Sequence, residues 1–127
     1  MLTLEEASKF HGHLGPFLVL GYRAGSYAME KLNPSSYKEI RCIVHTPLRT
    51  PYTCFVDGIQ SSTFCTLGKM NIELKDSKAV EVVFYCKEKQ LRIKVKESVL
   101  ERFANATLEE GSKEAEELEF SSLFEVS

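Results

Sequence analysis

The sequence predicts an α+β domain in which N-terminal helices pack on a small, mainly antiparallel sheet and C-terminal helices follow. Helical patterns with clear start and stop residues fill the chain up to residue 32. Short β-type segments separated by brief polar turns come next, and hydroxyl–carboxylate pairs typical of helix starts return near the end. This order of elements is that of an α+β architecture.

Length and composition indicate one soluble domain over residues 1–127. The chain is 43% hydrophobic and 27% charged, and its net charge of -2 gives no electrostatic basis for binding nucleic acid or an anionic membrane. The longest apolar run, residues 17–20, is far shorter than the roughly 20 residues that a membrane span needs. No charged-then-apolar export signal opens the chain, so we expect a cytoplasmic protein.

Two short helical patterns begin the chain. Thr3 followed by Glu6 is a capping box for a helix over residues 4–10, which Gly12 should end. Pro16 suits the first position of a second helix, over residues 16–32. Small residues recur along this second helix at intervals of four and three, which predicts close approach of another element; they are Gly21, Gly25 and Ala28.

A strand is predicted over residues 39–46 and a third helix over residues 54–64. The strand alternates, with Ile40, Cys42 and Val44 on one face. On the helix, a spacing of three places Cys54 and Asp57 on one side, away from the predicted core side that carries Phe55 and Ile59.

Three further strands are predicted over residues 71–75, 80–87 and 91–96. Their short connections indicate an antiparallel meander. Capping-box patterns at Ser98 and Thr107 then open C-terminal helices, of which the last is acidic and expected to be solvated.

The four cysteines, Cys42, Cys54, Cys65 and Cys86, lie far apart and form no CxxC pair. In a chain without an export signal this spacing indicates reduced thiols, and the paired cysteines of a zinc ribbon are missing. Cys42 and Cys86 lie on apolar strand faces, so we interpret both as core residues.

Three residues predict a metal site. His11 and His13 lie at the junction of the first two helices, where an extended triplet turns both imidazoles the same way, and imidazole binds zinc, copper, nickel and iron. Cys54 opens the third helix, where unpaired backbone N–H groups favour a thiolate, so we expect its pKa to lie below that of a free cysteine. The alternative is capping histidines and a cysteine that only packs.

Four other polar residues are candidates for the same site. Asp57 and Gln60 are candidates to orient a ligand or water, and Asp57 also to accept a proton; helix capping is the alternative. Arg23 and Lys69 are candidate contacts to an anionic cofactor, with solvated cations as the alternative.

Cys65 is a further candidate ligand with a geometric restriction. It follows Cys54 by eleven residues, so on one straight helix the two thiols would share a face but stand roughly 16 Å apart. Cys65 therefore joins the site only if the helix ends earlier and the chain folds back. Otherwise it belongs to another site or to a second copy of the chain.

Two stretches resemble a known family. The first reads FHGHLGP over residues 10–16 and continues with Gly21-Tyr22-Arg23. The second reads CFVDGIQ over residues 54–60 and is followed by Thr63, Cys65, Thr66, Gly68, Lys69 and Asn71. Together they resemble the FmdE family, proteins related to one component of the molybdenum formylmethanofuran dehydrogenase of methanogenic archaea.

The resemblance implies a compact, often dimeric α+β domain with a metal site for zinc or another divalent transition metal. It supports His11, His13, Cys54, Asp57 and Cys65 as site residues. Many members carry cysteine at position 15, and the loss of that thiol would reshape the site. Many also carry glycine at positions 17, 64 and 70, where larger side chains would narrow the adjacent pocket, and many continue into a C-terminal cysteine-rich zinc module that is absent here.

Three functions remain open on this basis. The first is a zinc-dependent oxidoreductase component linked to formylmethanofuran and one-carbon metabolism, with a second copy and the other components of molybdenum or tungsten formylmethanofuran dehydrogenase as partners. The second is a non-catalytic accessory or metal-delivery protein. The third is a metal-free thiol enzyme that uses Cys54.

Overall fold

The computed structural model describes residues 1–127. The helices are α1 (Leu4–His11), α2 (Pro16–Leu32), α3 (Cys54–Ser62), α4 (Glu97–Ala104), α5 (Leu108–Glu117) and α6 (Phe120–Leu123), with 3-10 helices η1 (Tyr37–Glu39) and η2 (Leu67–Lys69). The strands are β1 (Ile40–Thr46), β2 (Ile72–Asp76), β3 (Glu81–Cys86), β4 (Lys89–Val95) and β5 (Phe124–Val126).

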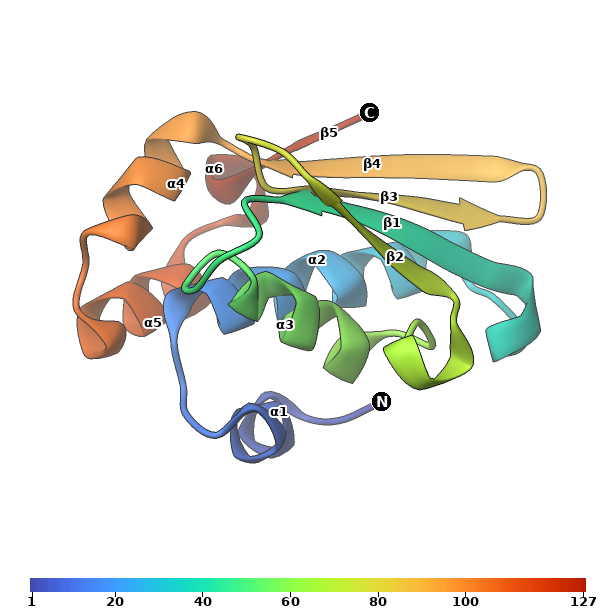
Figure 1. Ribbon diagram of the computed structural model, residues 1–127, viewed down its shortest axis with the longest axis horizontal. Helices are drawn as coiled ribbons and strands as arrows, with labels where there is room; N and C mark the ends of the chain where they lie inside the picture. Colours follow the sequence, from blue (N-terminus) through green and yellow to red (C-terminus); the bar gives the residue numbers. More distant parts are fainter.

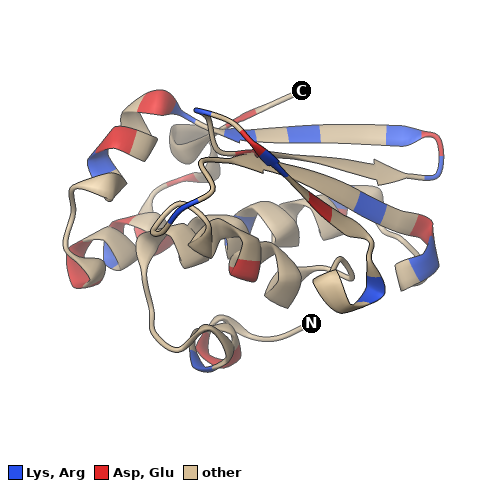
Figure 2. Cartoon of the chain, in the orientation of Figure 1, with Lys and Arg blue, Asp and Glu red and all other residues tan.

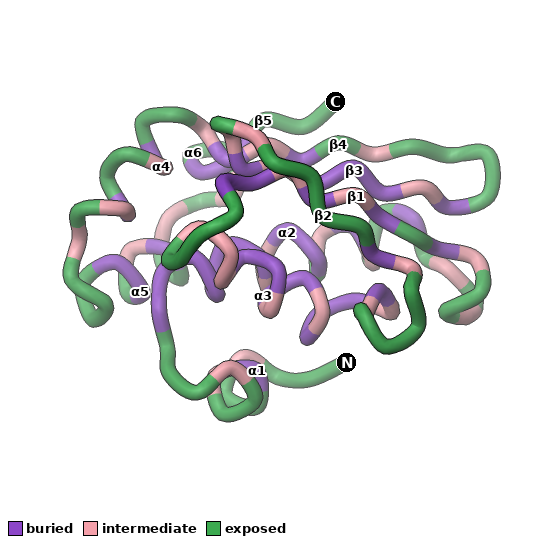
Figure 3. The backbone as a smooth tube through the Cα atoms, viewed as in Figure 1, coloured by how far each residue is buried: buried purple, intermediate pink, exposed green.

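The helices and the sheet form layers, as expected for the predicted α+β class. One face of the sheet packs on α2 and α3, while α1 lies on the side of these helices away from the sheet and α4 and α5 lie at one end (Figure 1). Buried backbone concentrates in α2, α3 and the central strands (Figure 3). None of the helices combines the length and apolar character that crossing a bilayer requires.

The N-terminal predictions are confirmed. The Thr3 hydroxyl accepts a hydrogen bond from the Glu6 N–H at 3.1 Å, and the Glu6 carboxylate accepts one from the Thr3 N–H at 2.8 Å. Helix α1 runs one residue further than expected, to His11, and Gly12 ends it with φ of 110°, a left-handed conformation that glycine adopts readily. Helix α2 begins at Pro16 and ends at Leu32, as predicted.

Helices α2 and α3 meet along glycines, which confirms the predicted close approach. A β-carbon on Gly21 would overlap the backbone carbonyl of Phe55, and one on Gly25 would overlap the Ser62 hydroxyl. Gly58 faces α2 in the same way from α3. Because the contacts advance along both helices together, α2 and α3 run in the same direction. Their N-termini therefore lie at the same end of the molecule (Figure 1).

The sheet has the order β2-β1-β3-β4-β5, with β1 and β2 parallel and the other neighbours antiparallel. The predicted hairpin of β3 and β4 is correct, but the prediction that β2 pairs with β3 is wrong. Strand β1 lies between them, because α3 carries the chain over the sheet and returns it parallel to β1, with Cys42 beside Ile72. The predicted buried face of β1 is confirmed at Ile40, Cys42 and Val44.

The C-terminal helices differ from two predictions. Helix α4 begins at Glu97, so Ser98 lies inside it and caps nothing. The reason is that Lys96, directly after β4, already caps the helix: its carbonyl accepts from the Leu100 N–H at 2.9 Å while its own N–H donates to the Leu123 carbonyl at 3.0 Å.

Helix α5 does begin after Thr107, whose hydroxyl accepts from the Glu110 N–H at 3.1 Å. The expectation that it is solvated is wrong for one of its sides, because Gly111, Ser112 and Ala115 are buried. Gly111 lies so close to Pro16 of α2 that a β-carbon there would stand 2.9 Å from the proline ring. The acidic residues of α5 thus occupy only its outer side.

Candidate metal centre

The structure brings His11, His13 and Cys54 together. One ligand atom from each lies within 4.8 Å of the others, although the cysteine is far from the histidines in the sequence. His11 and Cys54 are half-buried and His13 is exposed. The two imidazole rings lie 4.7 Å apart between centroids and tilt by 53°. The cluster therefore has a buried side and a side open to solvent.

The elements that place these residues all end or begin at one point. Helix α1 stops at His11, Gly12 turns the chain, and His13 precedes the start of α2. Cys54 is the first residue of α3, which follows the carboxyl end of β1 after a short loop. Because α2 and α3 are parallel, their unpaired N-terminal N–H groups face the same region and make it electropositive.

His11 is fixed by a carboxylate. Its Nδ1 lies 2.5 Å from Asp57 Oδ2, and an ionised carboxylate only accepts, so Nδ1 carries the proton. In a neutral imidazole with this tautomer, Nε2 keeps its lone pair. This atom is buried without any hydrogen-bond partner, in a side chain that is 10% exposed. A buried nitrogen with a free lone pair is costly unless a ligand is bound to it.

Asp57 is itself held on both oxygens. Its Oδ1 accepts from the Gln60 side-chain amide at 3.2 Å, and the Gln60 amide oxygen accepts from the Leu67 N–H at 2.9 Å. Asp57 is also the only charged residue of α3 (Figure 2). A chain of hydrogen bonds thus leads from the backbone of η2 through Gln60 and Asp57 to the His11 imidazole. It favours an orienting role for Asp57 and Gln60, since both carboxylate oxygens of Asp57 are already engaged.

The expectation of an acidic Cys54 is contradicted. Burial raises the pKa of the Cys54 thiol, and the nearby negative charge of Asp57 raises it further, while a backbone hydrogen bond only partly opposes them. The position of Cys54 at a helix start, taken alone, predicted a lowered pKa. Desolvation and a carboxylate one turn along the helix outweigh the helix N-terminus, so the free thiol is the favoured form in the protein without bound metal.

Position 15 adjoins the cluster. A β-carbon on Gly15 would lie 3.2 Å from His13 Cε1 and 3.3 Å from Leu108 Cδ2. The start of α5 therefore reaches the edge of the His11–His13–Cys54 cluster. Leu108 was not identified from the sequence, because nothing in local spacing connects it to Gly15 and its helix was expected to be solvated.

Cys65 is not brought to the cluster. Helix α3 ends at Ser62, and the hydroxyl of Thr63, which is extended, then accepts from the Cys65 N–H at 2.9 Å. The thiol is fully buried beside Cys42. The neighbouring Cys65 sulfur and burial raise the pKa of the Cys42 thiol well above its ordinary value. The chain thus leaves the helix but enters the core, rather than folding back to Cys54.

Arg23 and Lys69 are also not brought to the cluster. The Arg23 guanidinium donates to the Ala115 carbonyl at 2.8 Å and to the Leu118 carbonyl at 2.5 Å, which ties α2 to the end of α5. Burial lowers the pKa of Arg23. Lys69 Nζ donates to Thr66 Oγ1 at 2.7 Å, at the far end of α3 from Cys54.

The donor set fits a divalent transition metal. Two imidazoles and a thiol are ligands that zinc accepts, and ligand atoms around a four-coordinate zinc ion lie about 3.5 Å apart. The observed upper separation of 4.8 Å needs only small side-chain movements to reach that spacing. Three protein donors, with one side open, leave a coordination position for another molecule.

The fold and the site together define a compact α+β domain with an imidazole–thiol centre at one end. Comparison with family models matches residues 10–126 to FmdE, described as "Molybdenum formylmethanofuran dehydrogenase operon". The match covers nearly the whole chain, so this chain belongs to the FmdE family.

A curated relative is also similar. It is a protein of Archaeoglobus fulgidus named "Probable S-adenosyl-L-methionine-binding protein", with 35% identity over 115 residues. The alignment covers 84% of this chain, and the chain spans 30% of the length of that relative.

Proposed function

We propose that this chain binds a divalent transition metal, zinc in the first place, through His11, His13 and Cys54, and serves formylmethanofuran-linked one-carbon metabolism. The observation that carries the metal proposal is the buried, unpartnered Nε2 of His11 beside the other two donors. The metabolic role rests on membership of the FmdE family, whose description refers to the formylmethanofuran dehydrogenase operon.

Each residue has a separate part in this proposal. Asp57 holds the imidazole of His11 in the tautomer that presents Nε2, and Gln60 fixes Asp57. Cys54 gives up its proton when it becomes a ligand, as thiols do on metal binding. His13 supplies the donor on the solvent side. A bound zinc ion would supply Lewis acidity and an activated water at its open position.

The test is metal analysis of the full chain purified without added metal and after reloading with zinc. We expect close to one ion per chain, and loss of most of it in His11→Ala, His13→Ala and Cys54→Ala. His45→Ala is the matched control, because His45 is the third histidine of the chain and lies on β1 outside the cluster. Circular dichroism before and after loading checks that each variant is folded.

Two results would overturn the metal proposal. One is wild-type protein that binds no zinc, nickel, cobalt or copper after reloading. The other is stoichiometric metal in folded His13→Ala and Cys54→Ala, because the ion would then lie elsewhere.

A metal-delivery or accessory role is the second candidate. The observation that favours it is the exposure of His13, since a donor facing solvent can release and rebind an ion without opening of the fold. This role predicts rapid exchange of bound metal with a chelator and co-purification with a molybdenum or tungsten formylmethanofuran dehydrogenase. A catalytic role predicts slow exchange and turnover of a formyl-bearing substrate. The raised pKa of Cys54 counts against a metal-free thiol enzyme.

A homodimer is proposed as the assembly. Phe10 and Leu14, the neighbours of the two site histidines, are large exposed apolar residues, and Leu48 in the loop before α3 is exposed as well. Exposed apolar patches on protein surfaces often mark protein–protein contact surfaces. Light scattering after gel filtration of wild type and Leu14→Glu tests this: a dimeric wild type and a monomeric variant are expected.

Binding of S-adenosylmethionine is proposed only as an activity to be tested, since the matched relative carries that name and this chain corresponds to 30% of it. Calorimetric titration of the full chain with S-adenosylmethionine decides whether this segment holds the ligand.

A further inference from the structure

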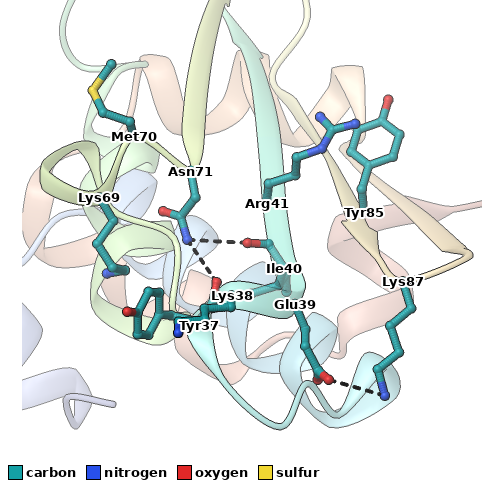
Figure 4. A pocket seen from close by; sticks show the side chains of 10 residues that line it. All are labelled: Tyr37, Lys38, Glu39, Ile40, Arg41, Lys69, Met70, Asn71, Tyr85 and Lys87. Atoms are coloured by element: carbon teal, nitrogen blue, oxygen red, sulfur yellow. Dashed lines mark hydrogen bonds and ion pairs between the residues drawn. The ribbon is translucent and has the colours of Figure 1, made fainter.

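A hollow lies at the opposite end of α3 from the candidate metal centre. It is a pocket of about 730 Å³ between η1, the start of β1, the turn after η2 and the end of β3 (Figure 4). Pockets that bind small molecules in proteins have volumes of about 300–1,000 Å³. Nothing in the proposed function uses this pocket.

The charge of the pocket is opposite to that of the chain. Four of its residues are basic and one is acidic, whereas the whole chain carries a net charge of -2. The single acid, Glu39, pairs with Lys87 at 3.4 Å. The other three basic residues, Lys38, Arg41 and Lys69, take part in no ion pair. All three line the pocket, with Arg41 directed toward Tyr85 and Lys69 lying beside Tyr37 (Figure 4), so an anion entering there meets positive charge that no carboxylate offsets.

The basic side chains have aromatic neighbours. The Arg41 guanidinium lies 4.2 Å from the centre of the Tyr85 ring, and Lys69 Nζ lies 6.0 Å from that of Tyr37 (Figure 4). Glu73 lines an adjoining hollow next to Arg41 but forms no ion pair with it. The ring contact therefore directs Arg41, whereas Lys69 is held by the Thr66 hydroxyl and lies near a ring, and no carboxylate pairs with either cation.

The floor of the pocket is fixed before any ligand arrives. The Asn71 side-chain amide donates to the Ile40 carbonyl at 3.3 Å and to the Phe64 carbonyl at 3.0 Å, and its oxygen accepts from the Thr66 N–H at 2.8 Å. One side chain thus joins β1, the chain that leaves α3 and the start of η2. Preorganisation of this kind lowers the entropic cost of binding.

The rim offers apolar surface beside the charges. Met70 is 85% exposed and Tyr37 is 48% exposed, and both line the pocket. Met70 has φ of 61°, which is uncommon for a residue other than glycine. A bare inorganic ion would use the cations but leave this apolar surface without a contact. An anion with an organic part would use both.

We propose that this pocket binds a phosphorylated small organic molecule of about mononucleotide size. The positive charge of Lys38, Arg41 and Lys69 attracts the phosphate, and Tyr37 and Met70 contact the organic part. Lysine and arginine side chains recognise phosphate, and the volume admits a ring as well as a phosphate group.

The experiment is isothermal titration calorimetry of the full chain at low salt with three probes: AMP, adenosine and inorganic phosphate. We expect AMP to bind, adenosine to give no measurable heat, and inorganic phosphate to bind at least tenfold more weakly than AMP. Affinity for AMP should fall as sodium chloride rises, because the contacts are mainly charge–charge.

Variants separate the pocket from general surface charge. The double variant Arg41→Gln/Lys69→Gln should weaken AMP binding at least tenfold, while Lys75→Gln, a change at an exposed lysine of β2 outside the pocket, should leave it unchanged. Tyr37→Ala should weaken AMP and leave phosphate unaffected. Metal content should be unchanged in all of them, which keeps this test apart from that of the metal centre.

Three results would overturn the proposal. They are no AMP binding at millimolar concentration, equal weakening by Lys75→Gln, and binding of inorganic phosphate as tightly as AMP. The last would reduce the pocket to a general anion site.

Discussion

The Nδ1 atom of His11 lies 2.5 Å from Oδ2 of Asp57, across a separation of 46 residues in the chain. A carboxylate behind a ligating imidazole fixes the tautomer and increases the basicity of the nitrogen that faces the metal. In this protein the carboxylate is in turn fixed by Gln60, so the position of His11 depends on the fold of α3.

Removal of the negative charge from Asp57 should therefore weaken metal binding without emptying the site. For Asp57→Asn we expect affinity for zinc to fall about 10- to 100-fold, because the ligands remain but their orientation is lost. Competition against a chromogenic chelator measures this. Wild-type affinity in a folded Asp57→Asn protein would show that the carboxylate does not support the site.

Gly21→Ala should destabilise the protein by about 3 kcal/mol, because its methyl group would overlap the Phe55 carbonyl and force α2 and α3 apart. Gly68→Ala is the control, since a β-carbon there meets nothing within 4 Å and the change should be neutral or slightly stabilising. Urea unfolding of the three proteins provides the comparison. Similar midpoints for wild type and Gly21→Ala would mean that the helices separate at little cost.

Arg23→Gln tests whether this residue serves structure or a cofactor. Its two hydrogen bonds to carbonyls at the end of α5 should make the substitution cost about 2 kcal/mol of stability. Metal content should not change. Arg92→Gln, which removes a partly exposed ion pair with Glu81 at 3.7 Å, should cost less than about 1 kcal/mol. If the Arg23→Gln protein kept its stability but lost ligand binding, the result would instead support the contact to an anionic cofactor predicted from the sequence.

Stability at acid pH should depend in part on Glu6. The Thr3 backbone N–H and, to a lesser extent, its hydroxyl hold the pKa of Glu6 below its ordinary value of 4.5. The unfolded chain therefore takes up this proton first, so the contribution is present above about pH 4.5 and is lost as pH falls through the folded pKa. Glu6→Gln should flatten the decline of stability below pH 4.5, measured by thermal unfolding at several pH values. Glu5→Gln, at a residue that makes no such bond to Thr3, should leave the slope of wild type.

Local chemistry made the first half of the fold predictable. Thr3 and Gly12 bound α1, and Pro16 begins α2, because each acts on its own backbone neighbours. The meeting of the histidine segment with Cys54 followed from the resemblance to a family and from the helix starts. The link from His11 to Asp57 was not foreseen, because no local spacing relates residues so far apart.

Longer-range relationships account for the errors. The short connection between β2 and β3 suggested a hairpin, but β1 is buried on its core face and takes a partner on each side, so it separates them. The pKa of Cys54 was expected to fall because the helix start was visible in the sequence while the burial of the thiol was not. The acidic composition of α5 predicted a solvated helix. It gave no sign that the opposite side of the helix, at Gly111, packs closely on Pro16.

The contact between α2 and α3 through Gly21, Gly25 and Gly58 has a consequence for how such a domain changes over time. Because the two backbones are in direct contact, the separation of α2 and α3 is fixed. The distance from Cys54 to the histidine turn is therefore set by the fold and not by individual side chains. New reactivity must then arise from substitutions of single residues on the turn itself. Position 15 is an example, because a β-carbon there would already contact the His13 ring at 3.2 Å.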